Sequence, residues 1–247
     1  MPRRYGLWAT LGLTAVALIT GVFASLAVAI GFALGMLIIR PDTDPRVLGE
    51  LLSGNGTLLS LTVVVSGGLT VAVVALFARL KKHISVREYL AWRWPGGRPL
   101  AFWCLMALLY LVVVETAGAL TDADLGGDFL VDAYCSTGFP LLTWLAFVAV
   151  APLSEEVLFR GFFLGGVADS RLGVAGAVLL SSLFWSVLHV QYAPWAVVLL
   201  VGAGVLFGVA RVKTGSLIPP LAMHALWNLV AVGLMTLEAF GPGGRCG

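Results

Sequence analysis

The chain has 247 residues, of which 60% are hydrophobic and 11% are charged, and its formal net charge is +2. Soluble globular domains carry about 25% charged residues, so this composition excludes a soluble globular domain and indicates a polytopic membrane protein. The net charge is uninformative by itself. The lipid bilayer is the expected environment, and no nucleic-acid partner is expected.

Seven apolar segments are long enough to cross a bilayer, for which a helix needs roughly 20 residues. The sequence therefore predicts an all-α fold, a polytopic transmembrane bundle of about seven helices. The first segment is longer than the apolar core of a signal peptide and no small-residue cleavage site closes it, so we expect a tilted or protruding helix. In chain order the segments span residues 5–39, 57–80, 100–120, 141–167, 172–190, 193–210 and 216–240.

The distribution of basic residues predicts the orientation of the bundle. If the N-terminus is cytoplasmic, eleven of the fifteen arginines and lysines lie on that side, and only Arg40, Arg46 and Arg245 lie outside. The positive-inside rule then predicts a cytoplasmic N-terminus and an extracytoplasmic C-terminus, in a plasma or inner membrane. The basic loop 79–98 is either an ordinary topology determinant or a surface that docks lipid or substrate.

Ionisable side chains within the apolar segments are the main functional signal, because a charge at membrane depth is costly unless it is paired or hydrated. They cluster in three of the later segments, which suggests one shared site rather than unrelated packing contacts. In chain order the ionisable groups are Glu115, Glu155, Glu156, Arg160, His189 and His224.

Helical spacing separates the two adjacent glutamates of the stretch LSEEVLFRG. Glu156 and Arg160 are four residues apart with the acid first, which is the favourable order for an ion pair on one helix face. Glu155 points about 100° away around the helix and lacks a dedicated cation, which favours a role as general base. The alternative is that both acids share Arg160 in an ion-pair triad that only fixes helix packing.

Two further spacings bring polar and aromatic side chains onto common helix faces. Trp185 and His189 are four residues apart, so the indole can form a wall beside the imidazole. His224 and Asn228 are also four residues apart, and two such donors can stabilise the oxyanion that forms when water attacks a carbonyl. The alternative for each histidine is a hydrogen bond that serves helix packing.

The ordered motifs EEVLFR at 155–160, WSVLH at 185–189 and HALWN at 224–228 resemble those of the CPBP intramembrane peptidases, which include the type II CAAX prenyl endopeptidase. This resemblance implies that Glu155 activates water with the help of His189. It also implies that His224 and Asn228 form an oxyanion hole, and that Glu156 and Arg160 support the site. Family members act on prenylated CAAX tails, bacteriocin-like peptides or C-terminal sorting segments, and the sequence does not choose among these substrates.

The resemblance also divides the chain. Residues 1–139 are expected to form three membrane helices and the basic loop 79–98, and they match no family. Residues 140–240 are expected to form the catalytic helical core, and residues 241–247 a flexible tail. The expected partner is a protein or peptide substrate in or at the membrane.

Other chemistries remain open from the sequence. Glu155, His189 and His224 are a His2Glu set that a catalytic zinc accepts, although no HExxH motif is present and the expected mechanism needs no cofactor. A proton- or ion-coupled transporter also uses buried Glu, Arg and His groups, but no inverted repeat is evident. A non-catalytic membrane scaffold that keeps the same fold is the third alternative.

Two of the three cysteines are candidates for a disulfide. Cys135 and Cys246 both fall on the predicted extracytoplasmic side, where a disulfide can persist, and two unpaired thiols are the alternative because the tail is expected to be mobile. Cys104 lies within a predicted helix.

Helix lengths place Glu155 about 21 Å from the outer end of its helix and His189 about 26 Å from the inner start of its helix. These depths differ, so the side from which substrate enters stays open.

Overall fold

The computed structural model describes residues 4–121, 127–190 and 192–246, with side chains at all of these except 121 and 127–130. This part of the chain is helical and contains no β-strand. Its α-helices and two π-helices (η) are α1 (Leu7–Ile39), α2 (Pro45–Gly54), α3 (Gly56–Leu80), α4 (Val86–Tyr89), α5 (Gly97–Thr121), α6 (Gly127–Cys135), α7 (Pro140–Trp144), η1 (Leu145–Val150), α8 (Ala151–Glu156), η2 (Val157–Phe163), α9 (Leu164–Ala168), α10 (Gly173–Val187), α11 (Pro194–Thr214) and α12 (Ile218–Phe240).

Six of the described helices are long and apolar enough to cross a membrane, which confirms the predicted all-α, multi-pass architecture. They are α1, α3, α5, the continuous helix Pro140–Ala168 that runs from α7 to α9, α11 and α12. The predicted span 172–190 is shorter than expected, because α10 has only 15 residues. At 1.5 Å per residue it is about 22 Å long, against about 30 Å for the hydrocarbon core.

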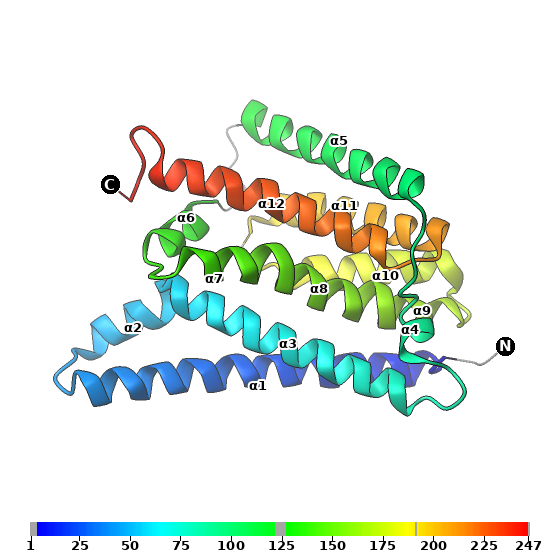
Figure 1. The fold of residues 1–247 in the computed structure, drawn as a ribbon, viewed down its shortest axis with the longest axis horizontal. Coiled ribbons are helices and arrows are strands. Elements are labelled where there is room, and N and C mark those ends of the chain that lie inside the picture. Colours follow the sequence, from blue (N-terminus) through cyan, green and yellow to red (C-terminus); the bar gives the residue numbers. More distant parts are fainter. Residues whose placement is uncertain (1–3, 122–126, 191, 247) are drawn as a thin grey trace.

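The bundle has two distinct ends (Figure 1). The N-terminus, α4 and α9 lie at one end, which we call the α4 end. The short helices α2 and α6 and the C-terminus lie at the other, which we call the α6 end. Helices α1 and α3 pack side by side, as do α10 with α11 and α5 with α12.

The helix Pro140–Ala168 is the centre of the packing, since its parts contact α1, α3, α10 and α12. Two π-helical stretches, η1 and η2, interrupt it on either side of α8. A π-helical turn adds a residue to the turn and changes which side chains face a given neighbour, and such turns are frequent at functional sites. The six residues of α8 include the two adjacent glutamates.

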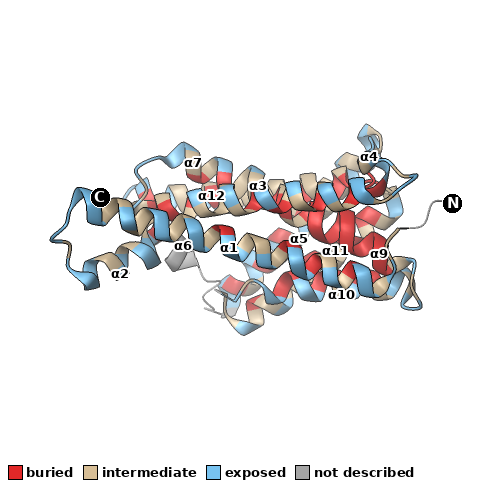
Figure 2. Cartoon of the chain, turned by 90° about the horizontal axis from the view of Figure 1, so that it is seen from below, coloured by how far each residue is buried: buried red, intermediate tan, exposed pale blue. Residues whose placement is uncertain are grey.

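The core of the bundle is aromatic and lies around this central helix. Phe159, Phe162, Phe207 and Met223 are each at most 1% exposed. Helix α1, in contrast, buries only Thr10, Thr14, Ala17 and Ala24, and its outer face is exposed along the helix (Figure 2). A long helix that is apolar on its exposed face fits contact with lipid.

The C-terminal residues are tied to α6. Cys135 and Cys246 form a disulfide with a Cα–Cα distance of 5.2 Å, so the paired alternative for these two cysteines is the one present. Arg245 Nη2 lies 2.9 Å from Asp132 Oδ1 and Nη1 lies 3.5 Å from Glu238 Oε1. Cys104 is a free cysteine. Residues 245 and 246 therefore add a covalent and an ionic connection between the chain terminus and α6.

Candidate active site

The central helix buries one ion pair completely. Glu156 Oε1 lies 2.9 Å from Arg160 Nη1, and neither side chain is exposed. The pairing of these two residues expected from their spacing is therefore present. Arg160 Nη2 also donates to the carbonyl oxygen of Gly204 at 3.1 Å. A Cβ atom at position 204 would lie 3.1 Å from that nitrogen and 2.9 Å from Ser182 Cβ, so glycine is needed for this close approach.

Two aromatic rings enclose the Arg160 guanidinium. Its Cζ atom lies 4.9 Å from the ring centroid of Trp185 and 5.6 Å from that of Phe207. Cation–π contacts of this kind are strongest where the cation is removed from water. The rings and Glu156 together explain how an arginine can be wholly buried at this depth.

His224 joins the buried pair, which the sequence did not indicate. Its Nδ1 lies 3.0 Å from Glu156 Oε1, the same oxygen that accepts from Arg160. Glu156 is 68 residues away along the chain, so no helical spacing connects the two. Glu156 thus holds both the guanidinium and the imidazole of α12 in place.

Glu155 lies where three segments converge. The indole Nε1–H of Trp185 donates to Glu155 Oε2. The same oxygen lies 4.0 Å from His189 Nε2 and 3.9 Å from His224 Nε2. The Glu155 side chain is 28% exposed, whereas Glu156 is fully buried. Of the two acids, Glu155 alone is open to a reactant.

The partners of each histidine Nδ1 determine what its Nε2 can do. His189 Nδ1 lies 3.0 Å from the backbone oxygen of Trp185, which can only accept, so Nδ1 carries the proton. In a neutral ring, Nε2 of His189 is then an acceptor that faces Glu155. His224 Nδ1 likewise faces a carboxylate, so His224 Nε2 donates only when the ring carries both protons.

Asn228 lies one turn beyond His224 on α12, as expected from the spacing. Its Nδ2 donates to the carbonyl oxygen of Phe147 at 2.7 Å. This carbonyl belongs to the π-helical stretch η1, where the change in hydrogen-bond register leaves backbone oxygens available. The bond fixes the carboxamide and leaves its second N–H free to serve a ligand.

These residues line a cavity of about 890 Å³, which we call the site cavity. Its walls include Glu155, Trp185, His189, His224 and Asn228, so all four predicted catalytic residues face one space. The lining continues along α3 to Asn55, between α2 and α3, and to Ser53 of α2. The cavity therefore extends from the central helix toward the α6 end.

The described residues between α10 and α11, 188–190 and 192–193, are non-helical where the chain passes this cavity. Leu188, His189 and Tyr192 follow the end of α10 and line the cavity before α11 begins at Pro194. Non-helical backbone at membrane depth is tolerated only where it is buried in protein or lines water. The break in the helix and the exposure of Glu155 both indicate a hydrated site.

Tyr192 was not singled out from the sequence. Its ring stacks on His189 with 6.0 Å between ring centroids. Its phenol lines the site cavity and can donate a hydrogen bond to a ligand there. No periodicity marks Tyr192, because it lies in a segment without regular structure.

The His2Glu set considered for zinc consists of Glu155, His189 and His224. Within the residues that the structure describes, no group of three His, Cys, Asp or Glu side chains is arranged to hold a metal ion. Glu155 Oε2, the oxygen nearest both imidazoles, accepts the Trp185 N–H, a contact that competes with metal coordination.

Comparison with known proteins adds to this geometry. Residues 137–230 match the family described as Type II CAAX prenyl endopeptidase Rce1-like. The resemblance drawn from the three motifs is confirmed over this part of the chain, which holds every residue of the candidate site. An uncharacterized 24.3 kDa protein of Escherichia coli is 33% identical over 128 residues, or 48% of this chain and 56% of the relative. The chain thus spans about half the length of that curated relative. No solved structure matches the chain.

Proposed function

We propose that this chain is an intramembrane endopeptidase that hydrolyses a peptide bond through water activated by Glu155. The observation that carries the proposal is the convergence of His189 and His224 on the one exposed acid of the cluster, at 4.0 and 3.9 Å. A partly exposed carboxylate beside two imidazoles in a membrane cavity suits general-base chemistry. The match to an endopeptidase family supports the same reading.

In the proposed reaction, Glu155 removes a proton from water while the water oxygen attacks the scissile carbonyl carbon. The carbonyl π bond opens and its electron pair moves to oxygen, which gives a tetrahedral oxyanion. Glu155 then delivers the proton to the leaving amine nitrogen as the C–N bond breaks. His189 Nε2 accepts the second water proton as a hydrogen bond and so orients the nucleophile.

The free N–H of Asn228 and Nε2–H of His224 stabilise the oxyanion in this scheme. Because His224 Nδ1 serves Glu156, donation from Nε2 requires the imidazolium form. The two glutamates then carry two negative charges, and Arg160 with His224 carries two positive charges. A cluster with no net charge is the arrangement that a low-dielectric interior tolerates best.

Glu156, Arg160 and Trp185 act as positioning residues. Glu156 fixes the His224 ring, Arg160 compensates Glu156, and the Trp185 N–H holds Glu155 Oε2. We infer that the buried pair is retained because it aligns the oxyanion donor, although a buried ion pair by itself contributes little net stability.

The substrate class that fits is a membrane-associated or lipidated protein or peptide. The site cavity runs along α1 and α3 among apolar side chains and reaches the α6 end. With the N-terminus in the cytoplasm, as the basic residues favour, the α6 end faces outward, which also suits its disulfide. Substrate then enters from the membrane or from the extracytoplasmic side.

The test is cleavage of peptides by the purified protein in detergent, where no ion gradient exists to drive a transporter. We expect cleavage that is lost in Glu155→Gln and unaffected by a chelator. Cleavage that is abolished by a chelator and restored by zinc would instead support a zinc mechanism that uses Glu155, His189 and His224 as ligands. Absence of cleavage across a broad set of membrane peptides would contradict the proposed peptidase function.

A further inference from the structure

A second, smaller pocket adjoins the site cavity on the side of α5 and α12. It has a volume of about 280 Å³ and shares lining residues with the site cavity, among them Tyr192, Leu200, Trp227 and Ala231. A chain seated against Glu155 can therefore extend a side chain into this pocket without leaving the protein.

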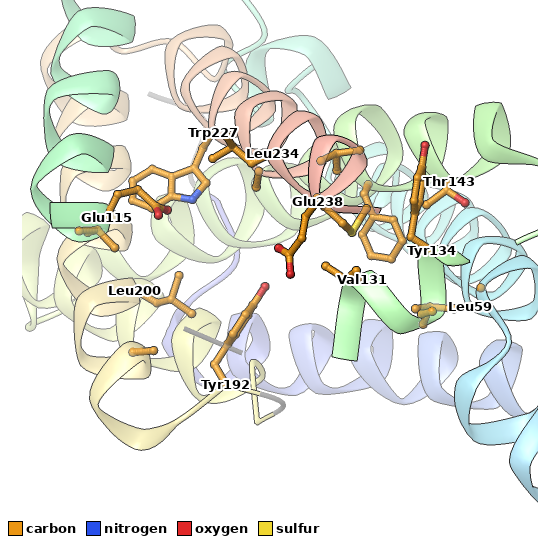
Figure 3. Close-up of a pocket in the computed structure, with 18 of the residues that line it drawn as sticks. Leu59, Glu115, Val131, Tyr134, Thr143, Tyr192, Leu200, Trp227, Leu234 and Glu238 are labelled. Carbon is orange, nitrogen blue, oxygen red and sulfur yellow. The ribbon is translucent and has the colours of Figure 1, made fainter. Parts of the chain in front are cut away.

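The walls of this pocket are apolar except for a few groups. Among the side chains that the structure describes, Glu115 of α5 and Glu238 of α12 are the charged ones that line it, and we call it the carboxylate pocket. Figure 3 shows the Glu238 carboxylate and the Tyr192 phenol projecting toward the same space from two different segments, with Glu115 beside Trp227. An aromatic and aliphatic lining with two carboxylates matches a side chain that has an apolar stem and a cationic tip.

The charge of the pocket is only partly compensated by the chain itself. Glu238 Oε1 lies 3.5 Å from Arg245 Nη1, and Arg245 is shared with Asp132 at 2.9 Å. Glu115 makes no hydrogen bond or ion pair with any residue that the structure describes. It lies six residues before the end of α5, about 9 Å along the helix axis and within the apolar span. Glu115 is exposed, so its carboxylate is open to a cationic group that a ligand brings.

We propose that the carboxylate pocket is a specificity subsite that binds a lysine or arginine side chain of the peptide substrate, near the scissile bond. This inference rests on the proposed peptidase function. It assigns Glu115 as the main determinant, because Glu238 already has a partner in Arg245.

Helix geometry predicts how many residues separate the basic side chain from the cleaved bond. Asn228 and Glu238 are ten residues apart on α12, which separates them by about 15 Å along its axis. An extended peptide advances about 3.4 Å per residue, and the stem of a lysine or arginine spans part of the distance. Glu115 lies beside Trp227, the neighbour of Asn228 in the chain (Figure 3), so the basic residue is expected at most about four positions from the cleaved bond, with apolar neighbours.

The experiment uses apolar fluorogenic peptides in which lysine is moved one position at a time, beside matched series carrying norleucine or glutamate. Wild-type protein is expected to show a kcat/KM about tenfold higher for lysine at one position, the size of effect that one charged hydrogen bond supplies. Glu115→Gln should remove most of that preference, and Glu115→Lys should shift it toward glutamate. Glu50→Gln is the matched control, since Glu50 is an exposed acid of α2 that lines neither cavity.

Binding gives a readout that does not depend on turnover. Labelled lysine and norleucine peptides are titrated into Glu155→Gln and into the double variant Glu155→Gln/Glu115→Gln. A lysine preference that disappears in the double variant supports the subsite. Cleavage that depends on Glu155 but shows equal preference in wild type and Glu115→Gln overturns the subsite alone. Binding selectivity for lysine without any cleavage overturns the peptidase and leaves the pocket as a cationic-peptide site.

Discussion

The Nδ1 atom of His224 lies 3.0 Å from Glu156 Oε1, so a fully buried acid orients the imidazole that faces the exposed acid next to it. The two adjacent glutamates therefore occupy different environments. Glu155 faces the site cavity, and Glu156 faces the protein interior, where it holds Arg160 and His224.

The first prediction concerns Glu155. The Glu155→Gln variant keeps an oxygen that can accept the Trp185 N–H, so we expect the thermal unfolding temperature to stay near that of wild type. The amide cannot take a proton from water, so cleavage should fall by roughly 10²-fold or more. Both quantities are measured on purified protein in detergent. Full activity in Glu155→Gln would falsify the proposed mechanism.

The second prediction concerns Glu156. Glu156→Gln leaves Arg160 as an unpaired buried cation, so it should destabilise the protein by about 3–5 kcal/mol, as removal of one partner of a buried pair does. Combined replacement of Glu156 by Gln and Arg160 by Met should recover part of this loss. The recovery should be only partial, because His224 Nδ1 and the Gly204 carbonyl also lose the partners that the buried pair supplies.

Activity measurements distinguish the role of Glu156 in positioning His224 from its contribution to the stability of the protein. The double variant should remain slow even where it is stable, because an amide holds the His224 imidazolium less firmly than a carboxylate does. Measurement of unfolding temperature and kcat on the same preparations checks both halves. A stable but inactive Glu156→Gln protein, together with full activity in Glu155→Gln, would reverse the roles given to the two acids.

The third prediction concerns the oxyanion donors. Asn228→Ala should lower kcat by roughly 10²–10³-fold, the effect of losing one such donor. It also leaves the Phe147 carbonyl without its partner, at a cost in stability of about 1–3 kcal/mol. Addition of His224→Ala should cost less than the product of the two single effects, because both groups act on one transition state. Multiplicative losses, or equal loss of folded yield and activity, would contradict a shared oxyanion site.

The fourth prediction concerns the disulfide. Cys135→Ser, or reduction, should lower stability by about 2–4 kcal/mol, since the bond closes a long loop between positions 111 residues apart. A membrane-impermeant thiol reagent applied to intact cells should label these cysteines only after reduction and should not reach Cys104. Labelling without reduction would show that the thiols are unpaired. Failure to label from outside after reduction would contradict the proposed orientation.

The sequence predicted the local features of this molecule well. Apolar length identified six of the spans, and a four-residue spacing identified the Glu156–Arg160 pair, because both properties depend only on near neighbours in the chain. The same spacing placed His224 and Asn228 on one face of α12. The roles of the four catalytic residues stay predictions until the variants are measured.

Contacts between segments far apart in the chain could not be predicted from the sequence. The contacts of Glu156 with His224 and of Glu155 with Trp185 depend on how helices are offset along their axes, which no periodicity encodes. The length of the fifth span was overestimated, because apolar residues continue past the end of α10 at Val187 into the non-helical segment. The mismatch in depth expected from helix lengths is absent, because His189 Nε2 lies 4.0 Å from Glu155 Oε2 and the two residues therefore share one depth.

The termination of α10 inside the bundle affects how the chain is counted across the bilayer. Six helices qualify as spans by length, and an even number of crossings would return both ends of the polypeptide to one compartment. The two termini instead lie at opposite ends of the bundle (Figure 1). We expect α10, together with residues 188–190 and 192–193, to complete a seventh crossing. Reporter domains fused to the two termini should then be active in different compartments.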